Sequence, residues 1–152
     1  QISGESPIVA LFAPVNESIW EHTKLVLWPM MLWWVLYDLF CGKQNEINRN
    51  KWYEGALFAL ITSLFSIPLL YYFYTGAFGV ECFWVDILIL LAALLFGQLL
   101  GLHVYRNGRG ICVTLVLGIF VALALLYGLF TFYPPHIPLF EESLTGSYGI
   151  NP

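Results

Sequence analysis

Carboxylate and imidazole side chains occur at helical spacing in one short stretch of this 152-residue chain. Glu17 and Glu21 are four residues apart, as are Ser18 and His22, so each pair shares a face if the stretch is helical. Carboxylates with imidazole bind divalent metals such as zinc or manganese, and the same groups relay protons. The candidate metal ligands are Glu17, Glu21, His22, Asp86 and His136, and the further polar residues of the expected pocket are Asn16, Ser18 and Glu81.

Asp86 is the candidate whose surroundings most need an explanation. It lies about seven residues beyond Gly79 in an apolar run, which corresponds to about 10 Å of helix at about 1.5 Å per residue. An ionised group at the centre of a membrane helix costs roughly 2.5–3.5 kcal/mol on insertion scales. Two interpretations stay open. Asp86 is the buried carboxylate of a functional site, or it is protonated or hydrogen-bonded to a Ser, Tyr or Trp of another helix.

The Glu17–His22 stretch also has a purely structural interpretation. Ser18 and Glu21 have the spacing of a capping box, in which both side chains bond backbone groups at the start of a helix. Lys24 can pair with Glu21 three residues before it, or lie on the same face as Glu17. Capping does not account for His22, so a genuine site that includes His22 remains the alternative.

The composition is that of a membrane protein. Hydrophobic residues make up 59% of the chain and charged residues 11%, and the mean hydropathy is +0.75. These values exclude a disordered chain, a basic nucleic-acid-binding protein and an ordinary soluble domain. Three scattered cysteines form neither a disulfide framework nor a C-x-x-C metal knuckle.

Four apolar runs are long enough to cross a bilayer as helices, which takes about 20 residues. We therefore predict an all-α integral membrane bundle in a single domain. The expected spans are about 17–41, 52–74, 78–105 and 111–133, with flanks at 1–16 and 134–152. An apolar segment in each flank is too short to span; it either covers the helix ends or lies flat in the interface.

The cations predict the orientation. Five of the six lie in the loops 42–51 and 106–110, so the positive-inside rule places these loops in the cytoplasm and both chain ends outside. Asp38 and Glu54 lie close to the cytoplasmic ends of their spans, and we expect them to reach Lys43, Arg49 or Lys51.

Small residues predict where helices approach closely. Gly97 and Gly101 form a G-x-x-x-G, and Gly118-x-x-x-Ala122 offers a matching ridge on the fourth span. The same glycines offer a surface for a homo-oligomer or other membrane helices. The lipid bilayer is the other expected partner, and no nucleic acid is expected.

The stretch Leu11-Phe12-Ala13-Pro14-Val15-Asn16-Glu17-Ser18-Ile19-Trp20-Glu21-His22 resembles the signature L-F-A-P-V-N-E-S-x-W-E-H of a family of small, uncharacterised bacterial membrane proteins. The resemblance implies a multi-pass protein of the bacterial cytoplasmic membrane with an additional helix upstream of Gln1, and it implies no activity. Ser18-x-x-x-His22 is also similar to a zinc-binding element of the progestin/adiponectin-receptor proteins. Their second element, His-x-x-x-His, is absent here, so zinc hydrolase activity does not follow from that likeness.

Three functions remain open on the sequence. The first is a cation- or proton-binding protein of transport type, with an outward-facing Glu/His/Asp pocket and Asp86 as its buried carboxylate. The second is a metal-dependent membrane hydrolase of lipids, in which a zinc-bound water is the nucleophile and Glu17 or Glu21 the general base. The third is a non-catalytic interaction subunit, which predicts that Asp86 and His22 lie far apart with local partners.

Overall fold

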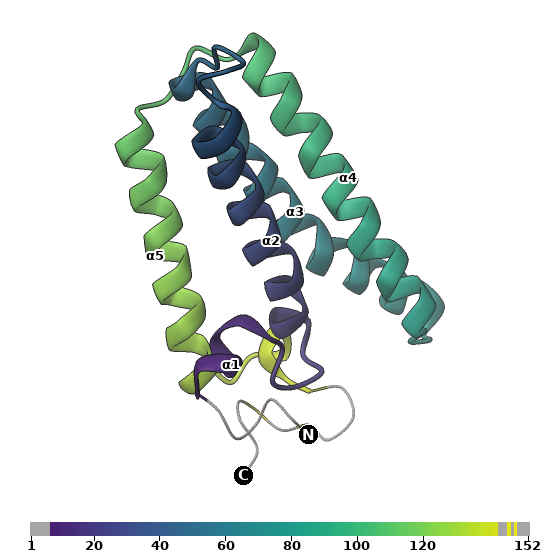
Figure 1. The fold of residues 1–152 in the computed structure, drawn as a ribbon. Coiled ribbons are helices and arrows are strands. Elements are labelled where there is room, and N and C mark those ends of the chain that lie inside the picture. The colour runs from purple at the N-terminus through teal and green to yellow at the C-terminus, as the bar shows by residue number, and fades with distance from the viewer. Residues whose placement is uncertain (1–6, 143–145, 147, 149–152) are drawn as a thin grey trace.

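The described part of the chain folds into four long helices, with two short ones at one end of them (Figure 1). The computed structural model describes residues 7–142, 146 and 148. The elements are α1 (Pro7–Phe12), α2 (Ile19–Cys41), α3 (Arg49–Phe78), α4 (Phe83–Asn107), α5 (Val113–Phe132) and the 3-10 helix η1 (Pro138–Phe140). We call the end that holds α1 and η1 the terminal end, and the end with the α2–α3 and α4–α5 connections the loop end.

The four long helices have the length and composition of membrane spans. Their outward surfaces carry large apolar side chains, among them Leu91, Leu95 and Leu99 of α4, each more than half exposed. Within the described residues no β-strand occurs, and a lone bridge joins Glu141 to Tyr148. The all-α membrane bundle is therefore confirmed, and the chain is a multi-pass membrane protein by the length and composition of its helices.

The expected boundary between the second and third spans was wrong. Phe78 belongs to α3 and not to the following helix. Gly79 ends α3 in the left-handed conformation, with φ 66°, and its N–H bonds the Thr75 carbonyl. A glycine adopts this conformation without the steric cost that a Cβ brings. Residues 79–82 are not helical, and α4 begins at Phe83.

The G-x-x-x-G of α4 packs against α3. A Cβ added to Gly101 would lie 2.7 Å from the Ala59 Cβ and 2.8 Å from the Gly55 carbonyl oxygen. Ser63 of α3 donates a hydrogen bond from its Oγ to the Ala93 carbonyl at 2.8 Å. By contrast, a Cβ on Gly118 meets nothing within 4 Å. The predicted close approach is confirmed, but its expected partner on the fourth span was wrong, because α3 covers this face of α4. Whether a second copy or other helices bind this chain stays a prediction.

The loop end carries two buried or partly buried carboxylates. Asp38 accepts hydrogen bonds from Arg49 Nε at 3.0 Å and from the Tyr53 hydroxyl at 3.2 Å, so its expected pairing with a loop cation is confirmed. Glu54 accepts a hydrogen bond from the Gly110 backbone N–H at 2.7 Å. It thereby ties the start of α3 to the α4–α5 connection.

Candidate functional site

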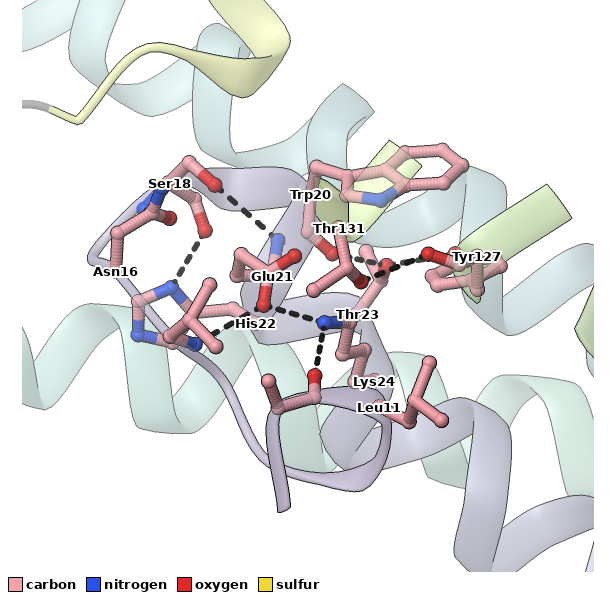
Figure 2. A network of polar contacts seen from close by, with 12 residues as sticks. Leu11, Asn16, Ser18, Trp20, Glu21, His22, Thr23, Lys24, Tyr127 and Thr131 are labelled. Carbon is pink, nitrogen blue, oxygen red and sulfur yellow. Dashed lines mark hydrogen bonds and ion pairs between the residues drawn. The ribbon is translucent and has the colours of Figure 1, made fainter. Parts of the chain in front are cut away.

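The segment between α1 and α2 is held by hydrogen bonds that begin the long helix (Figure 2). Ser18 is the N-cap of α2, and its Oγ accepts a hydrogen bond from the Glu21 N–H at 3.3 Å. Asn16 Oδ1 in turn accepts one from the Ser18 N–H at 3.1 Å. An N-cap oxygen satisfies one of the free N–H groups of the first turn. The capping role of Ser18 is therefore confirmed, and neither Asn16 nor Ser18 lines the pocket described below.

Glu21 and Lys24 form an ion pair inside the protein. Their side chains are 3% and 0% exposed, and Lys24 Nζ lies 2.6 Å from Glu21 Oε2. Lys24 Nζ also donates to the Ala10 carbonyl at 2.9 Å, and the same Glu21 oxygen accepts from the Val15 N–H at 3.0 Å. Buried charges are stable only when they are paired and hydrogen-bonded. This pair joins α1, the connecting segment and α2, so Glu21 has a structural role.

Trp20 and Thr23 attach the start of α2 to the terminal end of α5. The Trp20 ring stacks on Tyr127 with centroids 4.2 Å apart and an interplanar angle of 18°. Trp20 also packs against Phe140 of η1 at a centroid distance of 4.7 Å. Thr23 Oγ1 and the Tyr127 hydroxyl share a hydrogen bond of 2.7 Å. The conspicuous Trp of the sequence motif is therefore a packing anchor between three elements.

One ring nitrogen of His22 is hydrogen-bonded to the backbone at the start of its own helix. Its Nδ1 lies 2.9 Å from the Ser18 carbonyl oxygen. A carbonyl only accepts, so Nδ1 carries the proton and donates it. In the neutral imidazole, Nε2 is then the acceptor. The ring is partly buried and lines a pocket, which is the position a ligand-binding imidazole needs.

Asp86 has a partner on a neighbouring helix. The Tyr74 hydroxyl of α3 donates a hydrogen bond to Asp86 Oδ1 at 2.7 Å, and the Cys82 N–H donates to the Tyr74 oxygen at 3.3 Å. The interpretation of a hydrogen bond to a Tyr of another helix is confirmed. The expected stretch of about 10 Å of continuous helix between Gly79 and Asp86 was wrong, because α4 begins at Phe83 and Asp86 lies in its first turn.

A pocket of about 290 Å³ lies between α2, α3 and α4 at the terminal end. It brings together four of the predicted site residues, namely Glu17, His22, Glu81 and Asp86. Its remaining lining residues are one tyrosine and seven apolar side chains: Tyr71, Ile19, Leu25, Ile67, Phe83, Ile87, Ile89 and Leu90. We call this the acidic pocket. Its lining combines three carboxylates and an imidazole with mostly apolar side chains.

The expected metal ligands do not all converge. Glu21 pairs with Lys24, and the His136 ring packs against Tyr148 at a centroid distance of 4.8 Å. Glu17 and Glu21 do not share a helix face, because α2 begins only at Ile19. Among the described residues, no three His, Cys, Asp or Glu side chains form a group that could hold a metal ion.

Comparison with known proteins assigns the chain to a family. A family model described as a family of unknown function (DUF6512) matches residues 1–150. The chain belongs to this family. No curated protein and no solved structure matches the chain. Membership in the family assigns no activity, so the chemistry of the acidic pocket is the basis for a functional proposal.

Sequence reasoning missed three contributors at this end. Tyr74 holds Asp86, and nothing in its spacing pointed to that contact across the α3–α4 turn. Glu141 and Glu142 line a second cavity of about 240 Å³, which shares Glu81 with the acidic pocket. Their adjacency in the sequence, directly after the last apolar segment, could have indicated that they belong to this acidic end. The terminal end is therefore richer in carboxylates than the predicted site.

Proposed function

We propose that this chain is a multi-pass membrane protein that binds a cation in the acidic pocket. The observation that carries the proposal is the pocket's charge. Glu17, Glu81 and Asp86 line it, and none of its lining residues is a Lys or Arg. Lys24, the cation nearest along α2, is buried and paired with Glu21 instead. Carboxylates beside low-dielectric walls attract cations more strongly than they do in open water.

The packing of α3 against α4 supports entry of the cation from the terminal end. Toward the loop end, Ser63 of α3 bonds the Ala93 carbonyl of α4, and Gly97 is packed against the same serine. These contacts close the α3–α4 interface over the part of α4 between Asp86 and Gln98, which a transported cation would have to pass. The proposal is therefore binding from the terminal end, which the predicted orientation places outside the cell. A transport step of the kind predicted from the sequence needs α4 to separate from α3.

The alternatives have less support. A zinc hydrolase needs three protein ligands and an open coordination position, and the described residues hold no such group. An interaction subunit predicts that His22 and Asp86 lie far apart. Both have local hydrogen bonds, yet both line the acidic pocket.

Thermal unfolding of the whole chain in maltoside micelles tests the proposal. The probe is tetramethylammonium chloride, compared with sodium chloride at equal ionic strength so that screening is matched. The variant is the double substitution Glu17→Gln with Asp86→Asn, in which Asn keeps an oxygen for the Tyr74 hydroxyl. The control is Glu46→Gln, which removes an exposed carboxylate at the loop end.

Binding to the folded state stabilises it by about 1.4 kcal/mol at ten times the dissociation constant. We expect tetramethylammonium to raise the melting temperature of the unmodified chain and of the Glu46→Gln control, but not that of the double variant. Equal shifts in all three proteins, or no shift in any, would contradict the proposal.

A further inference from the structure

We infer that the cation is the head group of an amphiphile, an alkylammonium with a hydrocarbon tail, which enters the acidic pocket sideways from the bilayer. The inference rests on the proposed function, because it names the class of cation that this pocket takes. Its first support is the order of side chains along the pocket. The polar members lie at the terminal end, with Glu17 just before α2 and Asp86 in the first turn of α4.

The deepest lining residues are apolar, although Ile19 and Phe83 lie at the helix starts beside the polar members. Leu25 is six residues after the first residue of α2, and Leu90 is seven after the first residue of α4, which places them about 9 and 10.5 Å along their helices. Ile67 of α3 lines the same part of the pocket and is almost fully buried. Charge at one end and hydrocarbon below it, along the direction of the spans, is the arrangement of a lipid-like molecule in a bilayer leaflet.

The second support is the chemistry around the charge. Tyr71 and Phe83 line the pocket together with the carboxylates. Aromatic faces attract quaternary and other alkylammonium groups through cation–π interactions. Metal ions such as Ca²⁺ and Mg²⁺ instead need several oxygen ligands that converge on one point. The volume agrees with an organic ligand. A cavity of about 290 Å³ lies near the lower end of small-molecule pockets, which run from about 300 to 1,000 Å³.

The third support is the side opening of the pocket. Leu25 and Phe83 line the pocket, yet their side chains are 46% and 70% exposed. Figure 1 shows α4 running away from α2 toward the terminal end, with α3 behind the two. Because both exposed residues belong to helices that could span a membrane, this open side faces lipid. An amphiphile therefore reaches the pocket without its tail leaving the hydrocarbon.

The test compares three probes in native mass spectrometry of the whole chain released from maltoside micelles. They are decyltrimethylammonium, which has head and tail; tetramethylammonium, which has the head alone; and decyl sulfate, which has the tail with the opposite charge. The variant Leu25→Trp fills the apolar part of the pocket from its open side. Leu32→Trp is the matched control, because Leu32 is 54% exposed on the same helix and does not line the pocket.

We expect decyltrimethylammonium to bind at a concentration at least about tenfold lower than tetramethylammonium, and decyl sulfate not to bind. Leu25→Trp should weaken the binding of decyltrimethylammonium by about tenfold and leave the binding of tetramethylammonium unchanged. Leu32→Trp should change the binding of neither compound. Equal binding of the two decyl compounds, or equal effects of the two Trp variants, would overturn the inference. If tetramethylammonium still binds through Glu17 and Asp86 in that case, the proposed function stands; if neither cation binds, both fall.

Discussion

Replacement of Lys24 tests the buried ion pair that holds the terminal end together. In Lys24→Met the side chain stays unbranched and apolar but loses the ammonium, which contacts Glu21 at 2.6 Å and the Ala10 carbonyl at 2.9 Å. The Glu21 carboxylate then stays buried with the Val15 N–H as a donor. Removal of one partner of a buried pair costs about 3–5 kcal/mol, a large part of a total stability of about 5–15 kcal/mol.

A double-mutant cycle separates the pair from the individual side chains. We expect Glu21→Gln and Lys24→Met each to cost about 3–5 kcal/mol. The double variant has no buried charge and should cost about 1–3 kcal/mol, which is the cost of the unpaired Ala10 carbonyl. The coupling energy is then at least about 3 kcal/mol.

The assay is reversible unfolding in mixed micelles, followed by tryptophan fluorescence, since Trp20 packs against α5 and Trp28 bonds the Leu11 carbonyl at this end of the bundle. Lys43→Met is the control, because Lys43 is exposed at the loop end and should change stability by no more than about 0.5 kcal/mol. A loss below about 1 kcal/mol for Lys24→Met, or single effects that add up to the double, would refute the claim that this pair is buried and coupled.

Two further predictions concern packing and orientation. Gly97→Ala places a Cβ 2.6 Å from the Ala59 carbonyl oxygen, so it should lower the melting temperature strongly. Gly118→Ala is the control, because a Cβ there meets nothing within 4 Å and should leave the melting temperature unchanged. A similar loss in both variants would contradict the close packing of α4 on α3. Cys82 and Cys112 are exposed at opposite ends, and backbone N–H groups at the start of α5 lower the pKa of the Cys112 thiol, so both are suited to maleimide labelling. With an impermeant maleimide, peptide mapping should find Cys82 labelled in intact cells and Cys112 only after permeabilisation, and the reverse pattern would contradict the predicted orientation.

The helices were predictable from the sequence because their apolar runs are long and their boundaries carry glycine and capping residues. The third span was misplaced at its start, since Phe78 through Cys82 is apolar enough to continue either helix and Gly79 alone marks the turn. The helix that packs against Gly97 was predicted wrongly for a different reason. Small residues indicate that some helix approaches, but the choice between α3 and α5 depends on the packing of the whole bundle.

The candidate site was predicted in part. Glu17, His22, Glu81 and Asp86 do line one pocket, although Glu17 was expected on a helix face that it does not occupy. Glu21 was assigned both to capping and to a metal. Its pairing with Lys24 was one of the alternatives, whereas the Ala10 carbonyl that completes the pair lies fourteen residues away from Lys24 in the chain. Contacts of that kind depend on where α1 folds back, which local spacing does not encode.

Photochemical crosslinking tests the central claim, that the acidic pocket holds an alkylammonium amphiphile, most directly. The probe is an alkyltrimethylammonium with a diazirine within its tail, irradiated with the whole chain in bilayers and mapped by peptide mass spectrometry. We predict adducts at Leu25, Ile67 and Leu90, which excess decyltrimethylammonium suppresses and which the Glu17→Gln, Asp86→Asn variant lacks. Adducts spread over lipid-facing residues such as Leu91 and Leu95, unchanged by the competitor, would contradict the claim.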